Sequence, residues 1–175
     1  MYELIDENNS IKMMALIICT FNYGNVPYCL YSIDRDDTDT NIFVSKLVEN
    51  SQGCTLDNNF KSGEKEALED IIMDFLNKTS LDNLKEQGFI INDLKLNGIS
   101  KFNEKKCYIT TYNKSLLKEC MFHYGLEVPN DDSPIVEVKK SKPINKGNYE
   151  SILLIALGIM TIVICIFVII KIMGN

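Results

Sequence analysis

The chain has 175 residues and a formal net charge of −6 at pH 7, with 24 acidic side chains against 18 lysine and arginine side chains. Residues 1–80 carry most of the imbalance, with 14 acidic and 6 basic side chains. Nucleic-acid binding is not expected, because it depends on lysine and arginine contacts to phosphates and the sequence offers no basic stripe.

Six cysteines occur, and no two of them form a C-x-x-C pair, so we expect no zinc site and no other metal or cofactor. One cysteine lies in an apolar run near the C-terminus. We interpret the other five as small buried hydrophobic residues in a reducing compartment, where disulfides are rare. The six are Cys19, Cys29, Cys54, Cys107, Cys120 and Cys165.

Four strands are predicted in the first fifty residues from alternating or continuous apolar patterns separated by polar turns. They cover residues 2–5, 13–21, 26–33 and 42–48. Short strands joined by short turns are typical of an antiparallel meander.

A helix is predicted over residues 64–77, because apolar residues recur there at helical spacing. Ser62 is the expected N-cap, and Glu64 and Glu66 suit the positive end of the helix dipole. The apolar face of this helix is expected to cover the meander.

The first 78 residues resemble a known family. The pattern consists of Tyr-Glu-Leu-Ile-Asp at 2–6, Thr-Phe-Asn-Tyr at 20–23, Tyr-Cys-Leu-Tyr at 28–31, Phe-Val-Ser-Lys at 43–46 and Ile-Ile-Met-Asp-Phe at 71–75. It resembles the small DUF1292 domain of Firmicutes and Mollicutes, which includes the UPF0473 and YrzB-like proteins. The resemblance implies a bacterial cytoplasmic location. It implies no functional residue, because the biochemical role of that family is uncharacterised.

Residues 79–128 are predicted to form a second small unit that packs on the first, since about fifty residues are marginal alone. Ser80 caps a short helix at 81–86, and Asn113 or Ser115 caps another that runs to about residue 124. Between them, strands at 89–96 and 106–112 are expected to form a hairpin through the turn signal Asn97-Gly98.

The fold class is therefore predicted as α+β. An antiparallel β-meander plus an amphipathic helix occupies 1–78, a strand–helix unit occupies 79–128, and a flexible linker with lysines occupies 129–150. One C-terminal transmembrane helix follows at 151–171.

The transmembrane prediction rests on nineteen uncharged residues, 152–170, in which Thr161 is the only polar side chain. As a helix the run would be about 28 Å long, close to the thickness of a bilayer core. A buried helix of a globular core is the alternative, but the run leaves no solvated face. The residues predicted to contact lipid are Ile152, Leu153, Leu154, Ile155, Leu157, Ile159, Ile162, Val163, Ile164, Ile166, Phe167, Val168, Ile169 and Ile170.

Lysines precede this run and set the expected orientation. Lys139, Lys140, Lys142 and Lys146 favour a cytoplasmic location for the preceding residues, with the C-terminus outside. These lysines would also attract anionic lipid. The chain is thus expected to be a tail-anchored, single-pass membrane protein. Gly158 has no small residue four positions away on either side, so a simple anchor is favoured over a helix-pairing motif.

No known catalytic motif is found, and the acidic residues 34–39 lack the glycine and glutamate of a calcium-binding EF-hand loop. We predict a non-catalytic interaction domain held at the membrane, with an unidentified protein partner. One alternative is a thiol enzyme that uses Cys120 and His123, which are three residues apart and would share a helix side. Another is a small accessory subunit of a membrane complex.

Overall fold

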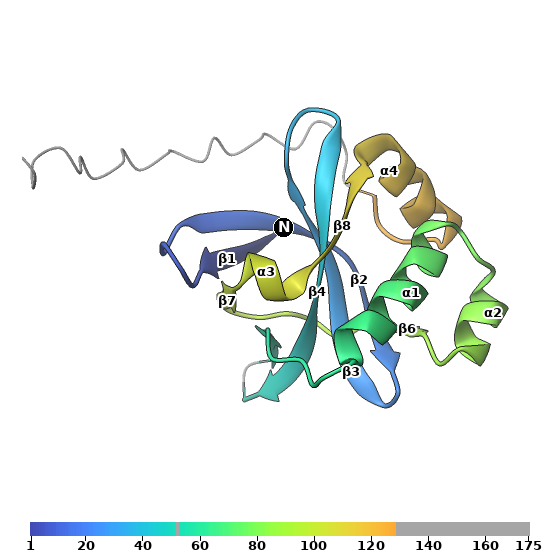
Figure 1. Ribbon diagram of the computed structural model, residues 1–175, viewed down its shortest axis with the longest axis horizontal. Coiled ribbons are helices and arrows are strands. Elements are labelled where there is room, and N and C mark those ends of the chain that lie inside the picture. Colours follow the sequence, from blue (N-terminus) through green and yellow to red (C-terminus); the bar gives the residue numbers. More distant parts are fainter. Residues whose placement is uncertain (52, 129–175) are drawn as a thin grey trace, which may run out of the picture. The chain divides into compact units, whose positions relative to one another are not determined.

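The computed structural model describes residues 1–51 and 53–128, which Figure 1 shows in colour. Within them lie eight strands and four helices. The strands are β1 (Tyr2–Asp6), β2 (Lys12–Tyr23), β3 (Val26–Asp34), β4 (Asp39–Asn50), β5 (Gly53–Asp57), β6 (Ile90–Asn92), β7 (Ser100–Phe102) and β8 (Tyr108–Asn113). The helices are α1 (Glu64–Leu76), α2 (Leu81–Glu86), α3 (Glu104–Cys107) and α4 (Lys114–His123).

All eight strands belong to one sheet, and six of them lie in the order β5, β4, β3, β2, β1, β7. The first four strands of the chain form the expected antiparallel meander, and β5 extends it. β7 joins the free edge of β1 in parallel, while β6 pairs with β2 and β8 pairs with β4. The last three strands therefore extend a sheet that the first five begin.

The two ends of the sheet approach each other, so that it is nearly closed into a barrel. Cys54 on β5 forms a parallel bridge with Leu96. Close by, the Ser100 hydroxyl accepts the backbone N–H of Leu56 at 2.9 Å and lies 2.8 Å from the Tyr2 hydroxyl. These contacts form a seam in which residues 96–100, up to the first residue of β7, join β5 and β1.

The predicted α+β class is wrong, because the described fold is mostly β with few helices. Residues 79–128 do not form a separate strand–helix unit: β6, β7 and β8 pair with β2, β1 and β4. The Asn97-Gly98 turn consequently joins no hairpin. Strands of three, three and six residues cannot bury a face by themselves, whereas the edges of the meander offer ready partners.

The strands in the middle of the sheet are buried on both faces. Tyr28 and Leu30 of β3 belong to an outer core, which also includes the apolar faces of α1, α2 and α4. Cys29 and Tyr31, which alternate with them, belong to a second core inside the barrel. Successive side chains of a strand point to opposite faces, so this continuous apolar run needs cover on both sides.

A bulge in β2 adjusts this alternation. Ile17 pairs with Tyr31 but Cys19 pairs with Leu30, so that Ile18 is an extra residue on β2. Ile18 and Cys19 both lie in the outer core as a result. The bulge lets β2 contribute two consecutive side chains beneath the helices.

The N-terminus of α1 is held by a carboxylate. Glu64 lies 2.8 Å from the Lys46 ammonium group and accepts hydrogen bonds at 2.6 Å from both the Tyr28 hydroxyl and the Lys61 N–H. Burial alone would raise the pKa of Glu64, but these three partners outweigh it and hold the pKa below its ordinary value. The start of α1 is thereby fixed to β3 and β4.

Two of the predicted helix caps are confirmed. Ser80 accepts a first-turn N–H of α2 at 3.4 Å, and Asn113 accepts two from α4 at 3.0 and 3.3 Å. The prediction for Ser62 is wrong, because the N-cap of α1 is Gly63, whose φ of 76° is left-handed. Glu64 and Glu66 do occupy the first turn of α1, as predicted.

No helix among the described residues is long and apolar enough to cross a bilayer. The predicted linker at 129–150 and the predicted span at 151–171 lie outside the described residues.

Gly53→Ala is expected to lower the free energy of unfolding by about 2–3 kcal/mol, because Gly53 has a φ of 137° that side chains rarely adopt. A Cβ there would also lie 3.0 Å from the Asn97 Cβ, at the seam. Gly24→Ala is the matched control, since its φ of 53° is left-handed but its surroundings are open, and should cost about 1 kcal/mol. Urea unfolding followed by circular dichroism measures both; equal losses would contradict a tightly packed seam.

Candidate functional site

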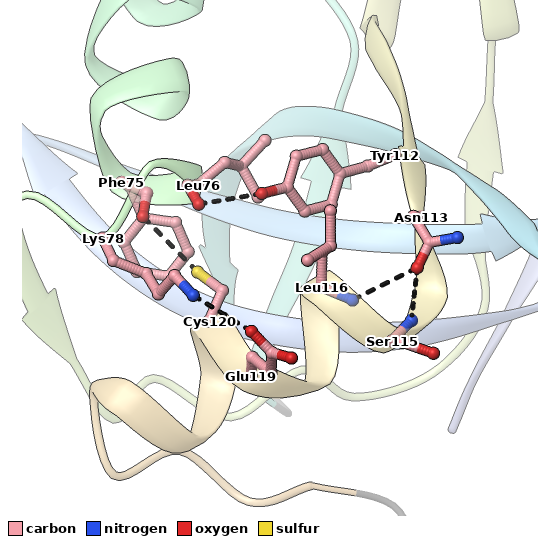
Figure 2. Close-up of polar contacts among 9 residues, drawn as sticks. All are labelled: Phe75, Leu76, Lys78, Tyr112, Asn113, Ser115, Leu116, Glu119 and Cys120. Atoms are coloured by element: carbon pink, nitrogen blue, oxygen red, sulfur yellow. Dashed lines mark hydrogen bonds and ion pairs between the residues drawn. The ribbon is translucent and has the colours of Figure 1, made fainter.

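The predicted lipid-contacting residues from Ile152 to Ile170 and the orienting lysines Lys139, Lys140, Lys142 and Lys146 lie outside the described residues. The predicted thiol pair lies within them. Cys120 is fully buried, and its thiol donates to the Phe75 carbonyl oxygen at 3.4 Å (Figure 2). Burial raises the pKa of this thiol to about 11.

His123 is exposed, and its ring packs edge-on against Tyr124 with centroids 4.8 Å apart. Cys120 instead faces α1, so a shared side of α4 does not bring the two groups into one cleft. The geometry therefore does not support a catalytic pair of Cys120 and His123, because a nucleophile needs access to substrate and hydrogen-bonding reach to its base.

Polar contacts hold α4 in this position, as Figure 2 shows. The Tyr112 hydroxyl donates to the Leu76 carbonyl oxygen at 3.0 Å, at the end of α1. Lys78 and Glu119 form an ion pair at 3.1 Å. Cys120 thus lies in the packed interface between α1 and α4.

The five described cysteines are all buried and free, which confirms their interpretation as small core residues. Cys107 also takes part in a polar cluster inside the barrel. Its thiol donates to Asn58 Oδ1 at 3.0 Å, and the Ser45 hydroxyl lies 3.4 Å from Cys107 Sγ and 2.9 Å from the Tyr31 hydroxyl. Burial raises the pKa of Cys107, although its hydrogen bonds and the charge of Lys65 act in the opposite direction.

Asn58 links this cluster to the backbone of β7. Its side chain is buried, and its Nδ2 donates to the Lys101 carbonyl oxygen at 2.9 Å. Asn58 therefore joins the segment after β5 to β7 and to the residue that ends α3. Sequence reasoning missed this role, because the polar run Asp57-Asn58-Asn59 has the pattern of a surface turn.

The acidic turn at 34–39 uses its carboxylates to close the connection between β3 and β4. Asp36 Oδ1 accepts the backbone N–H groups of Asp39 at 2.8 Å and Thr38 at 2.9 Å, and these bonds lower the pKa of Asp36. Asp34 forms an ion pair with Lys114 at 3.0 Å. In the part of the chain that the structure describes, no group of three or more histidine, cysteine or acidic side chains is placed to hold a metal.

A hollow of about 280 Å³ lies over the buried polar cluster. We call it the lysine hollow, since it is lined by Asn58, Asn59, Phe60, Lys65, Lys105 and Lys106. Its lysines come from α1 and α3. A second hollow, of about 260 Å³, shares Asn58 and Asn59 and is otherwise lined by residues of β5 and β7, by Ile99 and by Glu7.

The basic side chains of the lysine hollow are only partly neutralised. Lys65 lies 3.5 Å from Glu69, and the Lys106 ammonium donates to the neutral Asn59 Oδ1 at 3.4 Å. Within residues 1–51 and 53–128, neither Lys105 nor Lys106 has an ion pair with a carboxylate. Positive charge is thus concentrated at one place on an acidic protein.

Comparison with family models, with curated proteins and with solved structures found no match to this chain. The resemblance of residues 1–78 to the DUF1292 family stays a prediction from the residues.

Alkaline pH is expected to destabilise the fold through Cys120. An exposed thiol with its ordinary pKa near 9.0 ionises first in the unfolded chain, whereas the folded pKa is about 11. The stabilisation that the neutral Cys120 thiol gives to the folded state is therefore complete below pH 9. It is lost as pH rises towards 11, at roughly 1.4 kcal/mol per pH unit. Cys120→Ala should reduce the slope of unfolding free energy against pH in that interval. An unchanged slope would show that the Cys120 thiol is not shielded from solvent in the folded protein.

Asn58→Ala is expected to lower stability by about 2–3 kcal/mol, because it leaves the Lys101 carbonyl without its amide donor inside the fold. Asn59→Ala, at the adjacent exposed position, should change stability by less than about 0.5 kcal/mol. Chemical denaturation of both variants gives the comparison. Similar losses in the two would show that the buried amide has no special structural role.

Proposed function

We propose that this chain is a membrane-anchored protein that presents a non-catalytic binding domain at the cytoplasmic face of the membrane. The observation that carries the proposal is the uncharged run at 152–170, which has the length and hydropathy of a membrane span. Membrane lipid would be the first partner, and a protein partner at the same surface the second.

The described domain supports a binding role, because several of its thiols and hydroxyls are buried and take part in packing or in internal hydrogen bonds. The thiols of Cys107 and Cys120 are buried, and the hydroxyls of Tyr31 and Ser45 bond to each other inside the barrel. The surface instead offers hollows lined by polar and charged side chains.

Anchoring would act by raising local concentration. Twenty-three residues separate Val128 from Ile152, and their contour length limits the separation of these two residues to about 80 Å. A partner confined to the same surface would meet the domain at a much higher effective concentration than in solution.

The full chain, expressed in bacteria, is expected to stay in the membrane pellet after alkaline carbonate extraction. The double variant Ile159→Lys/Ile162→Lys should move to the soluble fraction, because each central lysine costs about 3 kcal/mol in a span. Thr161→Ser is the matched control and should remain in the pellet. Release of the unsubstituted chain by carbonate would overturn the proposal.

The orientation is tested with a thiol reagent that does not cross membranes. Asn175→Cys should be labelled in intact spheroplasts, because the lysines at 139–146 favour a cytoplasmic domain and an external C-terminus. Ser51→Cys, at an exposed position of the domain, should be labelled only after lysis. The reverse pattern would place the domain on the opposite side.

A further inference from the structure

We infer that the lysine hollow is a binding site for a phosphate-type anion. The inference goes beyond the proposed function and does not depend on it, because the hollow lies wholly within the described domain. It rests on the convergence of Lys65, Lys105 and Lys106, on their shortage of acidic partners, and on the walls of the hollow.

Convergence is the first argument. Lys65 belongs to α1 and is forty residues from Lys105 in the sequence, yet the fold places both beside one hollow. Like charges repel, so surface lysines gain stability by standing near acidic side chains. This chain has more acids than bases, and its fold nevertheless brings three lysines to one place.

Three acidic side chains near the hollow already have partners. Glu64 is occupied by Lys46, Tyr28 and the Lys61 N–H, and Asp57 accepts the Asn59 amide at 2.7 Å. Glu69 forms an ion pair with Lys65. Two of the three ammonium groups in the hollow thus lack a carboxylate in the described part of the chain, and an anion would supply the missing charge.

The donor set indicates the kind of anion. Lysine offers three donors and no acceptor, and the Asn58 and Asn59 side-chain oxygens already accept bonds within the protein. The ligand must therefore be rich in acceptors and negative. A phosphate presents oxygens in several directions and suits separate point charges, whereas a planar carboxylate is better matched by the fork of an arginine.

The size and walls allow more than a bare ion. The volume of about 280 Å³ exceeds that of one phosphate group, and Phe60 together with the lysine methylenes provides apolar surface. A phosphate ester fits this combination. The same chemistry belongs to a free phosphate ester and to the headgroup of an anionic phospholipid.

The first experiment measures how fast acetic anhydride acetylates individual lysines of the full chain, with mass spectrometry as the readout. The chain is held in alkyl maltoside micelles with sodium phosphate or glycerol 3-phosphate, against sodium chloride of equal ionic strength. Acetylation of Lys105 and Lys106 should fall about tenfold at a ligand concentration ten times the dissociation constant. Lys85, which is exposed on α2, is the internal control and should not change.

The lipid arm places the same chain in phosphatidylcholine nanodiscs with and without phosphatidic acid. Protection of Lys105 and Lys106 only with phosphatidic acid would identify a lipid headgroup as the source of the phosphate. Protection by glycerol 3-phosphate in micelles would identify a soluble ester. Equal protection of Lys85, or no protection in either arm, would overturn the inference.

A matched pair of variants provides an independent test. Lys105→Gln/Lys106→Gln should weaken phosphate binding about tenfold, as followed by the ligand-dependent rise in melting temperature. Lys12→Gln/Lys85→Gln removes the same net charge away from the hollow and should keep the full rise. Equal rises in both double variants would refute a site at the hollow. The acetylation measurement needs no variant, so the inference stays testable if a variant fails to fold.

Discussion

The structure depends on covering β3 and β4 on both faces. Each residue from Tyr28 to Tyr31 is buried, and alternate side chains enter different cores. A sheet covered by helices on one side and open on the other would leave Tyr31 and its neighbours in water. Closing the sheet around them solves this problem, and it explains why residues that follow α2 return to pair with β1, β2 and β4.

Closure also creates the two polar features of the domain. The hydroxyls and thiol that face inward cannot be solvated, so Tyr31, Ser45 and Cys107 satisfy one another together with Asn58. Asn58 belongs to the segment that leaves β5, and the same segment supplies one wall of the lysine hollow. The interior cluster therefore fixes the position of the surface above it, and we expect the arrangement of the hollow to be rigid.

The elements with local periodicity are predictable from the sequence, including the first four strands, α1 and the caps of α2 and α4. The partners of the later strands are not, because nothing in three or six residues specifies an edge of β1 or β4. Cys120 and His123 illustrate a similar limit. Their spacing indicates a shared helix side, but packing against Phe75 buries one and leaves the other in solvent. Among the residues that line the lysine hollow, the adjacent lysines Lys105 and Lys106 can be noticed in the sequence, but their proximity to Lys65 cannot be predicted from it.

The seam has a consequence for the order of folding. Tyr2 and Ser100 meet across 98 positions of sequence, and Ser45 and Cys107 across 62. Such distant contacts form late, since the entropy of a long loop is lost before any contact compensates it. The meander can assemble first, with its outer edges waiting for β7 and β8. The walls of the lysine hollow meet only when α3 docks, so an anion that binds there would recognise the finished domain alone and would hold its last-arriving segment in place.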